Sequence, residues 1–251
     1  MKEDLTMVSV LVVIPTYNEV ENIVKIIPNI CQVFGDNNFE YQILVVDDNS
    51  PDGTAIEFEK MKKENSFLHL LKRSGKLGLG SAYIDGFTWA LSNLSFDIVV
   101  QMDADFSHRP LDIIKIVNAV NIGADIAIAS RYVENGGSNK WPLHRRMISR
   151  VANFLSHIML GINVKDITSG FRAMRRDAVK ELLNYKMNSN GYSYQVECLA
   201  IYEDLHLSIT EVPYIFEARL SGKAKLSIKE IFRFAWFVTK LSYSGVSKKD
   251  N

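Results

Sequence analysis

The chain has 251 residues, of which 47% are hydrophobic, so it is long enough and apolar enough for one α/β domain or two small ones with a large core. Its 29 basic and 29 acidic side chains balance to a formal net charge of +0, which argues against nucleic acid as a partner and requires any anion-binding site to be local.

Apolar runs and cysteines predict the compartment. The run "VSVLVVIP" is too short for the core of a signal peptide, and no run reaches the roughly 18 apolar residues that a membrane-spanning helix needs. Cys31 and Cys198 are far apart in helix-like stretches, which favours buried, reduced thiols over a disulfide or a metal site. We therefore expect a cytoplasmic protein that is not integral to a membrane.

The first half alternates short β-branched runs with longer amphipathic stretches, which is the pattern of a parallel sheet with crossover helices. The predicted strands are Val8–Ile14, Tyr41–Val46, Leu68–Leu71, Ile98–Met102 and Ile126–Ala129. The predicted helices between them are Val20–Val33, Thr54–Lys63, Gly80–Leu91 and Leu111–Val120. Four strands end in the polar stretches "PTYNE", "DDNSPDGT", "DAD" and "SRY", which should converge on one crevice at the carboxyl edge of the sheet.

The pattern changes after Tyr132. The stretch "VENGGSNKWP" predicts a loop, and apolar residues at helical spacing predict a helix over Leu143–Leu160. The first turns of this helix carry Arg145, Arg146 and Arg150, which oppose the helix dipole and indicate either an anion site or a solvated basic face. The C-terminal stretch "SIKEIFRFAWFVTKLSY" predicts an amphipathic helix that lies on a membrane surface or packs on protein.

Two nucleotide-binding motifs can be tested directly. The turn "PTYNE" has no glycine and "GLGSAY" lacks the third one, so the dinucleotide fingerprint fails, and no P-loop is present. The stretch "KLGLGSA" still places small residues at a helix start, where backbone N–H groups can meet phosphate. Asp47 and Asp48 end a buried strand and either bind a base or ribose or cap the next helix, a role that we assign to Asp52.

The stretch "IVVQMDADFSHRP" is a buried strand that ends in two carboxylates. Asp103 and Asp105 are two residues apart, so in extended chain both point to one side. Their repulsion requires a cation between them, a raised pKa on one carboxyl, or full solvation. Carboxylates of this kind suit Mg²⁺ or Mn²⁺ shared with a diphosphate, although a solvated turn is the alternative. We interpret the nearby His108 as a surface or capping residue. The later stretch "ARLSGKAKLS" places Arg219, Lys223 and Lys225 around a glycine, as an anion-binding loop or a solvated basic loop would.

The chain resembles a known family from about Val8 to Ser227. The ordered set "VVIPTYNE", "VVDDNSPDGT", "KLGLGSAYIDGF", "MDADFSHRP", "ASRYVENGG", "DITSGFRAM" and "RLSGKAKLS" resembles the inverting family 2 glycosyltransferases of GT-A fold, and among them the dolichyl-phosphate mannose synthases. The resemblance implies an α/β fold with a mostly parallel central sheet and flanking helices. It also implies GDP-mannose as donor, dolichyl or another polyprenyl phosphate as acceptor, and Mg²⁺ or Mn²⁺ as cofactor.

The resemblance also assigns roles to residues. It implies that the nucleoside is held by Pro15, Tyr17, Glu19, Val46 and Asp48, with Asp47 beside them, and that Lys76, Gly78 and Ala104 also lie at the donor site. Asp103 and Asp105 would bind the metal and the diphosphate, and Arg131, Arg219 and Lys225 would bind phosphates; these five are the candidate catalytic residues. Ser107 stands where some relatives carry a Gln that helps to bind the metal, and Ala224 where the family usually has Ser.

The predicted organisation is one catalytic domain over residues 1–227, followed by an amphipathic helix and polar tail over 228–251. The long C-terminal membrane region of some relatives is missing, so we expect a protein on the cytoplasmic face of a membrane, held peripherally or by small anchoring subunits. Three alternatives remain: a sister transferase that uses UDP-glucose or another donor, a nucleotidyltransferase, and a non-catalytic subunit that binds nucleotide sugars.

Overall fold

A computed structural model describes residues 8–37, 39–139, 142–189, 191, 193–217 and 228–249. A seven-stranded sheet with the order β3-β2-β1-β4-β7-β5-β8 forms its centre, and only β7 pairs antiparallel to its neighbours. The strands are β1 (Ser9–Thr16), β2 (Glu40–Asp47), β3 (Leu68–Lys72), β4 (Ile98–Gln101), β5 (Ile126–Ser130), β7 (Arg172–Arg175) and β8 (Ile209–Pro213). The mostly parallel central sheet expected from the sequence is confirmed.

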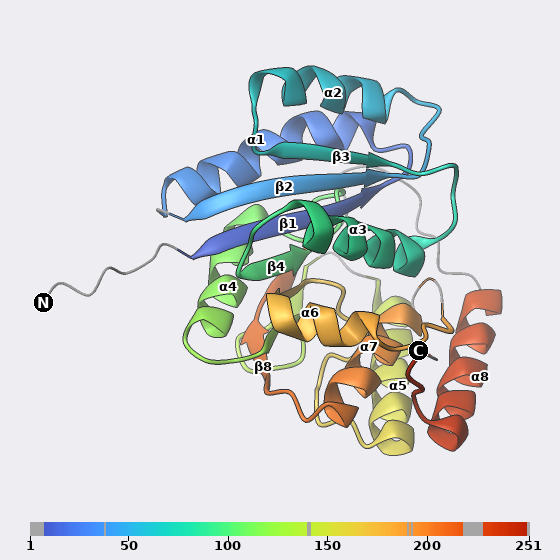
Figure 1. Ribbon diagram of the computed structural model, residues 1–251. Coiled ribbons are helices and arrows are strands. Elements are labelled where there is room, and N and C mark those ends of the chain that lie inside the picture. The colour runs from blue at the N-terminus through green and yellow to red at the C-terminus, as the bar shows by residue number, and fades with distance from the viewer. Residues whose placement is uncertain are drawn as a thin grey trace, which may run out of the picture.

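Helices cover both faces of the sheet. The helices are α1 (Val20–Gly35), α2 (Thr54–Glu64), α3 (Leu79–Asn93), α4 (Ile113–Asn121), α5 (Leu143–Leu160), α6 (Arg176–Leu183), α7 (Ser193–Asp204) and α8 (Ile228–Ser244). Helices α1, α2 and α4 pack on one face, and α3, α6 and α7 pack on the other (Figure 1). The split follows from strand pleating, because Val10 and Val12 of β1 face the first group whereas Leu11 and Val13 face the second.

The predicted elements of the first half are confirmed to within a residue or two at each end, with one local difference. The predicted helix that starts at Leu111 begins instead with a 3-10 turn, Pro110–Asp112, before α4. Proline at the first position has a fixed backbone angle that suits such a start. The predicted loop after Tyr132 contains a two-residue strand, β6 (Gly137–Ser138), which pairs with β9 (Ile215–Phe216).

The two amphipathic helices α5 and α8 pack against each other at one end of the molecule (Figure 1). Each leaves large apolar side chains exposed on its outer side. Within the described residues, neither these helices nor any other is both long enough and apolar enough to cross a membrane. Both cysteines are free thiols in helices as predicted, but only Cys198 is fully buried, while Cys31 is half-buried.

Candidate functional site

The polar stretches at the ends of β1 and β2 lie side by side. The parallel register pairs Thr16 with Asp47, and the Asp48 N–H donates to the Thr16 carbonyl at 3.0 Å. The Asp47 carboxylate is occupied by local bonds, because it accepts the hydroxyl of Thr16 at 2.9 Å and both the N–H and the hydroxyl of Ser50. Asp47 therefore holds the loop that follows β2 onto the end of β1.

Asp48 faces a buried cation that the sequence reading missed. Arg73, directly after β3, lies with Nη1 2.5 Å from the Asp48 carboxylate and donates further to Asp85 and Ser81 on α3. Burial raises the pKa of Asp48 above its usual range, while Arg73 and the N–H groups of Leu77 and Gly78 act in the opposite direction. The only signal in the sequence was the position of an arginine at a strand end.

Asp52 has the capping role predicted for it, and serves a second helix as well. Its Oδ1 accepts the N–H of Thr54 at 3.0 Å, in the first turn of α2, and its Oδ2 accepts the N–H of Val20 at 3.1 Å, at the start of α1. Gly53 between Asp52 and α2 has φ 90°, a conformation that costs glycine little. One carboxylate thus fixes the two helix starts that flank the β1 loop.

The remaining candidates for nucleoside binding surround this edge. Tyr17 follows β1 directly, and the Lys76 ammonium lies 4.2 Å from the centre of its ring, so an aromatic face and a cation meet at the strand ends. Gly78 immediately precedes α3. The other positions are the half-buried Pro15 in β1, Glu19 just before α1 and the buried Val46 in β2.

The acidic turn after β4 is tightly built. The Asp105 carboxylate accepts the N–H of Ser107 at 3.1 Å and its hydroxyl at 2.6 Å, around Phe106 in a left-handed conformation with φ 62°. His108 is not at the surface as one reading of the sequence had it: it is 5% exposed and its Nδ1 lies 3.0 Å from the Asp103 N–H, which it accepts. His108 therefore has the capping role, as the neutral tautomer with its proton on Nε2.

The turn offers hard oxygen ligands from Asp103, Asp105 and Ser107. Asp103 is half-buried and Asp105 buried, with the buried Ala104 between them. The part of the chain that the structure describes contains no group of three or more His, Cys, Asp or Glu side chains placed to bind a metal. Two carboxylates still suit Mg²⁺ or Mn²⁺, because these ions commonly take one or two from protein and fill their shell with phosphate and water.

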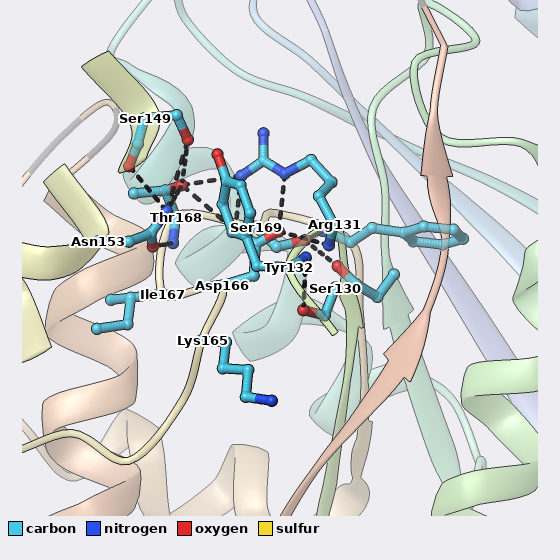
Figure 2. Close-up of polar contacts among 12 residues, drawn as sticks. Ser130, Arg131, Tyr132, Ser149, Asn153, Lys165, Asp166, Ile167, Thr168 and Ser169 are labelled. Carbon is cyan, nitrogen blue, oxygen red and sulfur yellow. Dashed lines mark hydrogen bonds and ion pairs between the residues drawn. The ribbon is translucent and has the colours of Figure 1, made fainter. Parts of the chain in front are cut away.

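Arg131 follows β5 on the same edge, but β7 separates β5 from β4. Its Nε and Nη2 donate to the two oxygens of Asp166 at 2.7 and 2.6 Å, and Nη2 also donates to the Thr168 hydroxyl (Figure 2). Burial alone would lower the pKa of Arg131, but the adjacent Asp166 carboxylate outweighs it and raises that pKa. Arg131 is thus a fixed cation at the edge where the acidic turn lies.

The structure brings most of the predicted site together. The loops after β1, β2 and β4 are neighbours, and Arg131 lies two strands farther along the sheet. Arg219, Lys223, Ala224 and Lys225 lie outside the described residues. From the sequence alone, no role was assigned to Arg73, Asp166 or Thr168. Asp166 and Thr168 nevertheless lie in the stretch "DITSGFRAM", which contributes to the family resemblance.

Comparison with known proteins identifies the class. The model of the glycosyl transferase family 2 matches residues 11–183, which include both strand-end carboxylate pairs and Arg131. The chain belongs to glycosyl transferase family 2. It is therefore a glycosyltransferase, and the alternative hypothesis of a nucleotidyltransferase is excluded.

Curated relatives narrow the class. The chain is 39% identical over 218 residues to a polyprenol monophosphomannose synthase of Mycolicibacterium smegmatis, covering 86% of this chain and 80% of the relative. It is 41% identical over 218 residues to an undecaprenyl-phosphate mannosyltransferase of Micrococcus luteus, covering 87% of each. A dolichol-phosphate mannosyltransferase of Pyrococcus furiosus is 36% identical over 92% of this chain, which spans 63% of that relative.

A solved structure supports the fold. Glucosyl-3-phosphoglycerate synthase from Mycobacterium tuberculosis, in complex with Mn²⁺, UDP and glucosyl-3-phosphoglycerate, superposes with a TM-score of 0.66 at 21% identity. The match covers 97% of this chain and 81% of that one. At this identity the likeness establishes the shared fold.

Proposed function

We propose that the protein transfers mannose from GDP-mannose to dolichyl or another polyprenyl phosphate, with inversion at the anomeric carbon. The observation that carries the proposal is the identity of 36–41% to three relatives named as mannose transferases or synthases of polyprenyl or dolichol phosphates. The site geometry agrees with it, because paired carboxylates and a fixed arginine lie at the carboxyl edge of one sheet. That edge is where open α/β sheets bind nucleotides.

The donor nucleoside would bind at the ends of β1 and β2. Tyr17, with Lys76 against its ring, offers a face for stacking, and Asp48 offers a carboxylate that Arg73 holds in place. The remaining contacts that the family resemblance implies come from Pro15, Glu19 and Val46. These residues would orient GDP so that its diphosphate points toward the acidic turn after β4 and the start of α3 at Gly78.

Asp103 and Asp105 would hold Mg²⁺ or Mn²⁺. Ser107 already donates its hydroxyl to Asp105, so we assign it chiefly to fixing that carboxylate, with a direct bond to the metal as the alternative. The bound cation would neutralise charge on the diphosphate leaving group. Asp105 and Ser107 fix the turn before the substrates arrive, so no reorganisation is needed during the reaction.

The acceptor is a phosphate monoester, which is largely dianionic near neutral pH because its second pKa is about 6. One of its oxygens would attack the anomeric carbon directly, forming the new C–O bond as the C–O bond to GDP breaks and GDP carries away the electron pair. No general base is required. Arg131, together with Arg219 and Lys225, would bind the phosphates and bring two anions into reaction distance, which can lower the barrier by several kcal/mol.

We further propose that α5 and α8 place the site at a membrane surface, as a lipid acceptor requires. Their outer side, here called the α5–α8 face, exposes nine large apolar side chains among the described residues: Leu143, Met147, Val151, Phe154, Leu155, Ile158, Phe232, Trp236 and Tyr243. Helix α5 has no acidic residue and α8 has only Glu230, whereas Arg145, Arg150, Arg233 and Lys240 are cationic. Apolar side chains flanked by cations suit the surface of anionic lipid.

In this proposal residues 1–227 form the catalytic domain and 228–251 the helix and tail that help to hold it at lipid or at a small anchoring subunit. The cytoplasmic location stays a prediction. An acceptor that is a lipid phosphate makes a membrane-bound position useful, since the enzyme then meets acceptor that is already confined to the surface.

The proposed function is tested by transfer of labelled mannose from GDP-mannose to dolichyl phosphate in detergent, with Mg²⁺, with Mn²⁺ and with EDTA. UDP-glucose serves as the competing donor. Mannose transfer that EDTA abolishes would support donor, acceptor and metal together. Transfer from UDP-glucose alone would contradict the donor, and transfer that is unchanged by EDTA would contradict the metal.

A further inference from the structure

Asp166 holds Arg131 at two points, the backbone and the side chain. It accepts the Arg131 N–H at 2.8 Å and the side-chain Nε at 2.7 Å through Oδ2, and Nη2 at 2.6 Å through Oδ1. Asp166 is completely buried and the Arg131 side chain is 9% exposed. A planar guanidinium bound by both carboxylate oxygens is fixed in orientation as well as in place.

Asp166 is itself anchored on the sheet. Glu211, in β8, accepts the N–H of Asp166 at 2.9 Å through one oxygen and the N–H of Lys165 at 2.9 Å through the other. Strand β8 pairs with β5, the strand that Arg131 follows. The carboxylate that holds Arg131 is therefore tied to the same part of the sheet from which Arg131 emerges.

Thr168 connects this pair to α5. Its hydroxyl accepts from Nη2 of Arg131 at 2.9 Å and lies 3.4 Å from the hydroxyl of Ser149 and 3.4 Å from the side-chain Nδ2 of Asn153 (Figure 2). The backbone N–H of Thr168 donates to the side-chain Oδ1 of Asn153 at 3.1 Å. Ser149 and Asn153 are one helical turn apart on α5. The inner side of α5 thus contacts the residue that supports Arg131, while its outer side belongs to the α5–α8 face.

Stability alone is a poor reason for such an arrangement. A buried ion pair often contributes little net stability, because the cost of removing both charges from water offsets their attraction. The effect of the arrangement is instead to fix the direction of the Arg131 guanidinium. Asp166 binds the backbone and the side chain of Arg131, and the Thr168 hydroxyl connects the same guanidinium to α5.

We propose that Asp166 is the residue that positions Arg131 for the acceptor phosphate, and that Thr168 links this arginine to α5. The inference rests on the proposed function, in which Arg131 binds that phosphate. It adds that acceptor affinity depends on residues that touch no substrate. Loss of the Thr168 hydroxyl should weaken acceptor binding about tenfold, as loss of one hydrogen bond to a charged group does, and leave GDP binding unchanged.

The experiment measures binding of geranyl phosphate, a water-soluble phosphate monoester, and of GDP by calorimetry, beside mannose transfer to dolichyl phosphate. Thr168→Val removes the hydroxyl with little change of shape, and Thr168→Ser keeps it. Asp166→Asn keeps the shape and removes the charge. Asp125→Asn is the matched control, because Asp125 precedes β5 at its opposite end, bonds to Ser208 and pairs with Arg175.

The expected result is weaker geranyl phosphate binding in Thr168→Val and Asp166→Asn, a higher acceptor KM, unchanged GDP binding, and wild-type behaviour in Thr168→Ser and Asp125→Asn. A merely structural role would lower the melting temperature without this selective loss. Should Asp166→Asn fail to fold, the Val and Ser variants of Thr168 decide alone.

The proposal is overturned if folded Thr168→Val binds geranyl phosphate as well as the wild type, or if Arg131→Met does. Either result is compatible with mannose transfer by the wild-type protein. In that case the proposed function stands, and only the inference about Asp166 and Thr168 is refuted. Conversely, no mannose transfer by the wild type would refute the proposed function, and the binding comparison, which needs no donor, would still decide the role of Asp166 and Thr168. Absence of geranyl phosphate binding by the wild type would also overturn the inference.

Discussion

Arg73 and Asp48 form an ion pair in which Nη1 and Oδ1 are 2.5 Å apart and both side chains are more than nine-tenths buried. Arg73 follows β3, Asp48 follows β2, and the same guanidinium donates to Ser81 and Asp85 of α3. Three elements that flank the proposed nucleoside site therefore meet at one cation. The orientation of Asp48 depends on that cation, since the carboxylate has little access to water.

Replacing Arg73 by Met should reduce both stability and donor binding. The change leaves Asp48 buried without its cation, which typically costs about 3–5 kcal/mol, and it frees α3 from the end of β3. Urea unfolding would measure the first effect and calorimetry with GDP the second. The control is Lys60→Met, which breaks an exposed pair with Glu57 on α2 and should change neither. Wild-type GDP affinity in a folded Arg73→Met protein would refute the role given to Asp48.

Two variants of the acidic turn after β4 should reduce mannose transfer to different extents. Asp105→Ala should lower the rate of metal-dependent transfer by about a thousandfold or more. The reason is that the diphosphate would lose the charge stabilisation, worth several kcal/mol, that a bound cation supplies. Ser107→Ala removes one hydroxyl bond to Asp105 and should cost about tenfold. The measurement is mannose transfer across a Mn²⁺ titration, with circular dichroism to confirm folding. Unimpaired transfer by folded Asp105→Ala would defeat the metal assignment, and a loss in Ser107→Ala as large as in Asp105→Ala would make Ser107 a ligand.

Gly86 predicts a pure packing effect. A Cβ at this position of α3 would lie 2.9 Å from Val46 and 3.2 Å from Val13, in the layer between helix and sheet. Gly86→Ala should therefore lower the free energy of unfolding by about 1–3 kcal/mol despite the better helix propensity of alanine. Gly75→Ala meets no atom within 4 Å and should be nearly neutral. Denaturant midpoints compare the two, and equal stability would mean that α3 can move away from β1 and β2 at little cost.

The sequence was most informative where pattern and position coincide. The strands and helices as far as Ser130 follow from apolar periodicity, and the capping by Asp52 follows from its place before a helix. No element was predicted between Gly161 and the C-terminal stretch. There, β7 is only four residues long and enters the sheet antiparallel between β4 and β5, which local periodicity does not encode. Helix α7 is buried on most sides, so it has little amphipathic pattern to detect.

In the site, too, local features could be predicted from the sequence and long-range contacts could not. Asp103 and Asp105 were recognisable because both carboxylates lie within one strand-end stretch. The partners of Asp48 and Arg131 were not, because Arg73 is 25 residues from the first and Asp166 is 35 residues from the second. Such pairs arise only when the sheet has aligned its strand ends. His108 was misjudged in part for a related reason, since the ring of Phe171 that stacks on it at 4.8 Å comes from the segment in which no element was predicted.

The α5–α8 face should bind anionic lipid vesicles. Phe154 is 63% and Trp236 71% exposed, and each would transfer a large aromatic surface from water into the headgroup region. The double variant Phe154→Ser/Trp236→Ser should weaken binding by about tenfold or more, since burial of each aromatic side chain contributes roughly 1.5–3 kcal/mol when complete. Co-sedimentation with vesicles that contain anionic lipid measures the effect, and high salt should weaken wild-type binding because the flanking cations are then screened.

The chain offers a matched control for that variant. Leu111 is 73% and Ile122 86% exposed, and they lie before and just after α4 in the chain. Helix α4 is at the opposite side of the view in Figure 1 from α8. Leu111→Ser/Ile122→Ser removes as many exposed apolar side chains without touching the α5–α8 face, so vesicle binding should stay at the wild-type level. Equal losses in both double variants would mean that general surface hydrophobicity drives the binding. Wild-type vesicle binding by the Phe154→Ser/Trp236→Ser protein would contradict the membrane role given to the α5–α8 face.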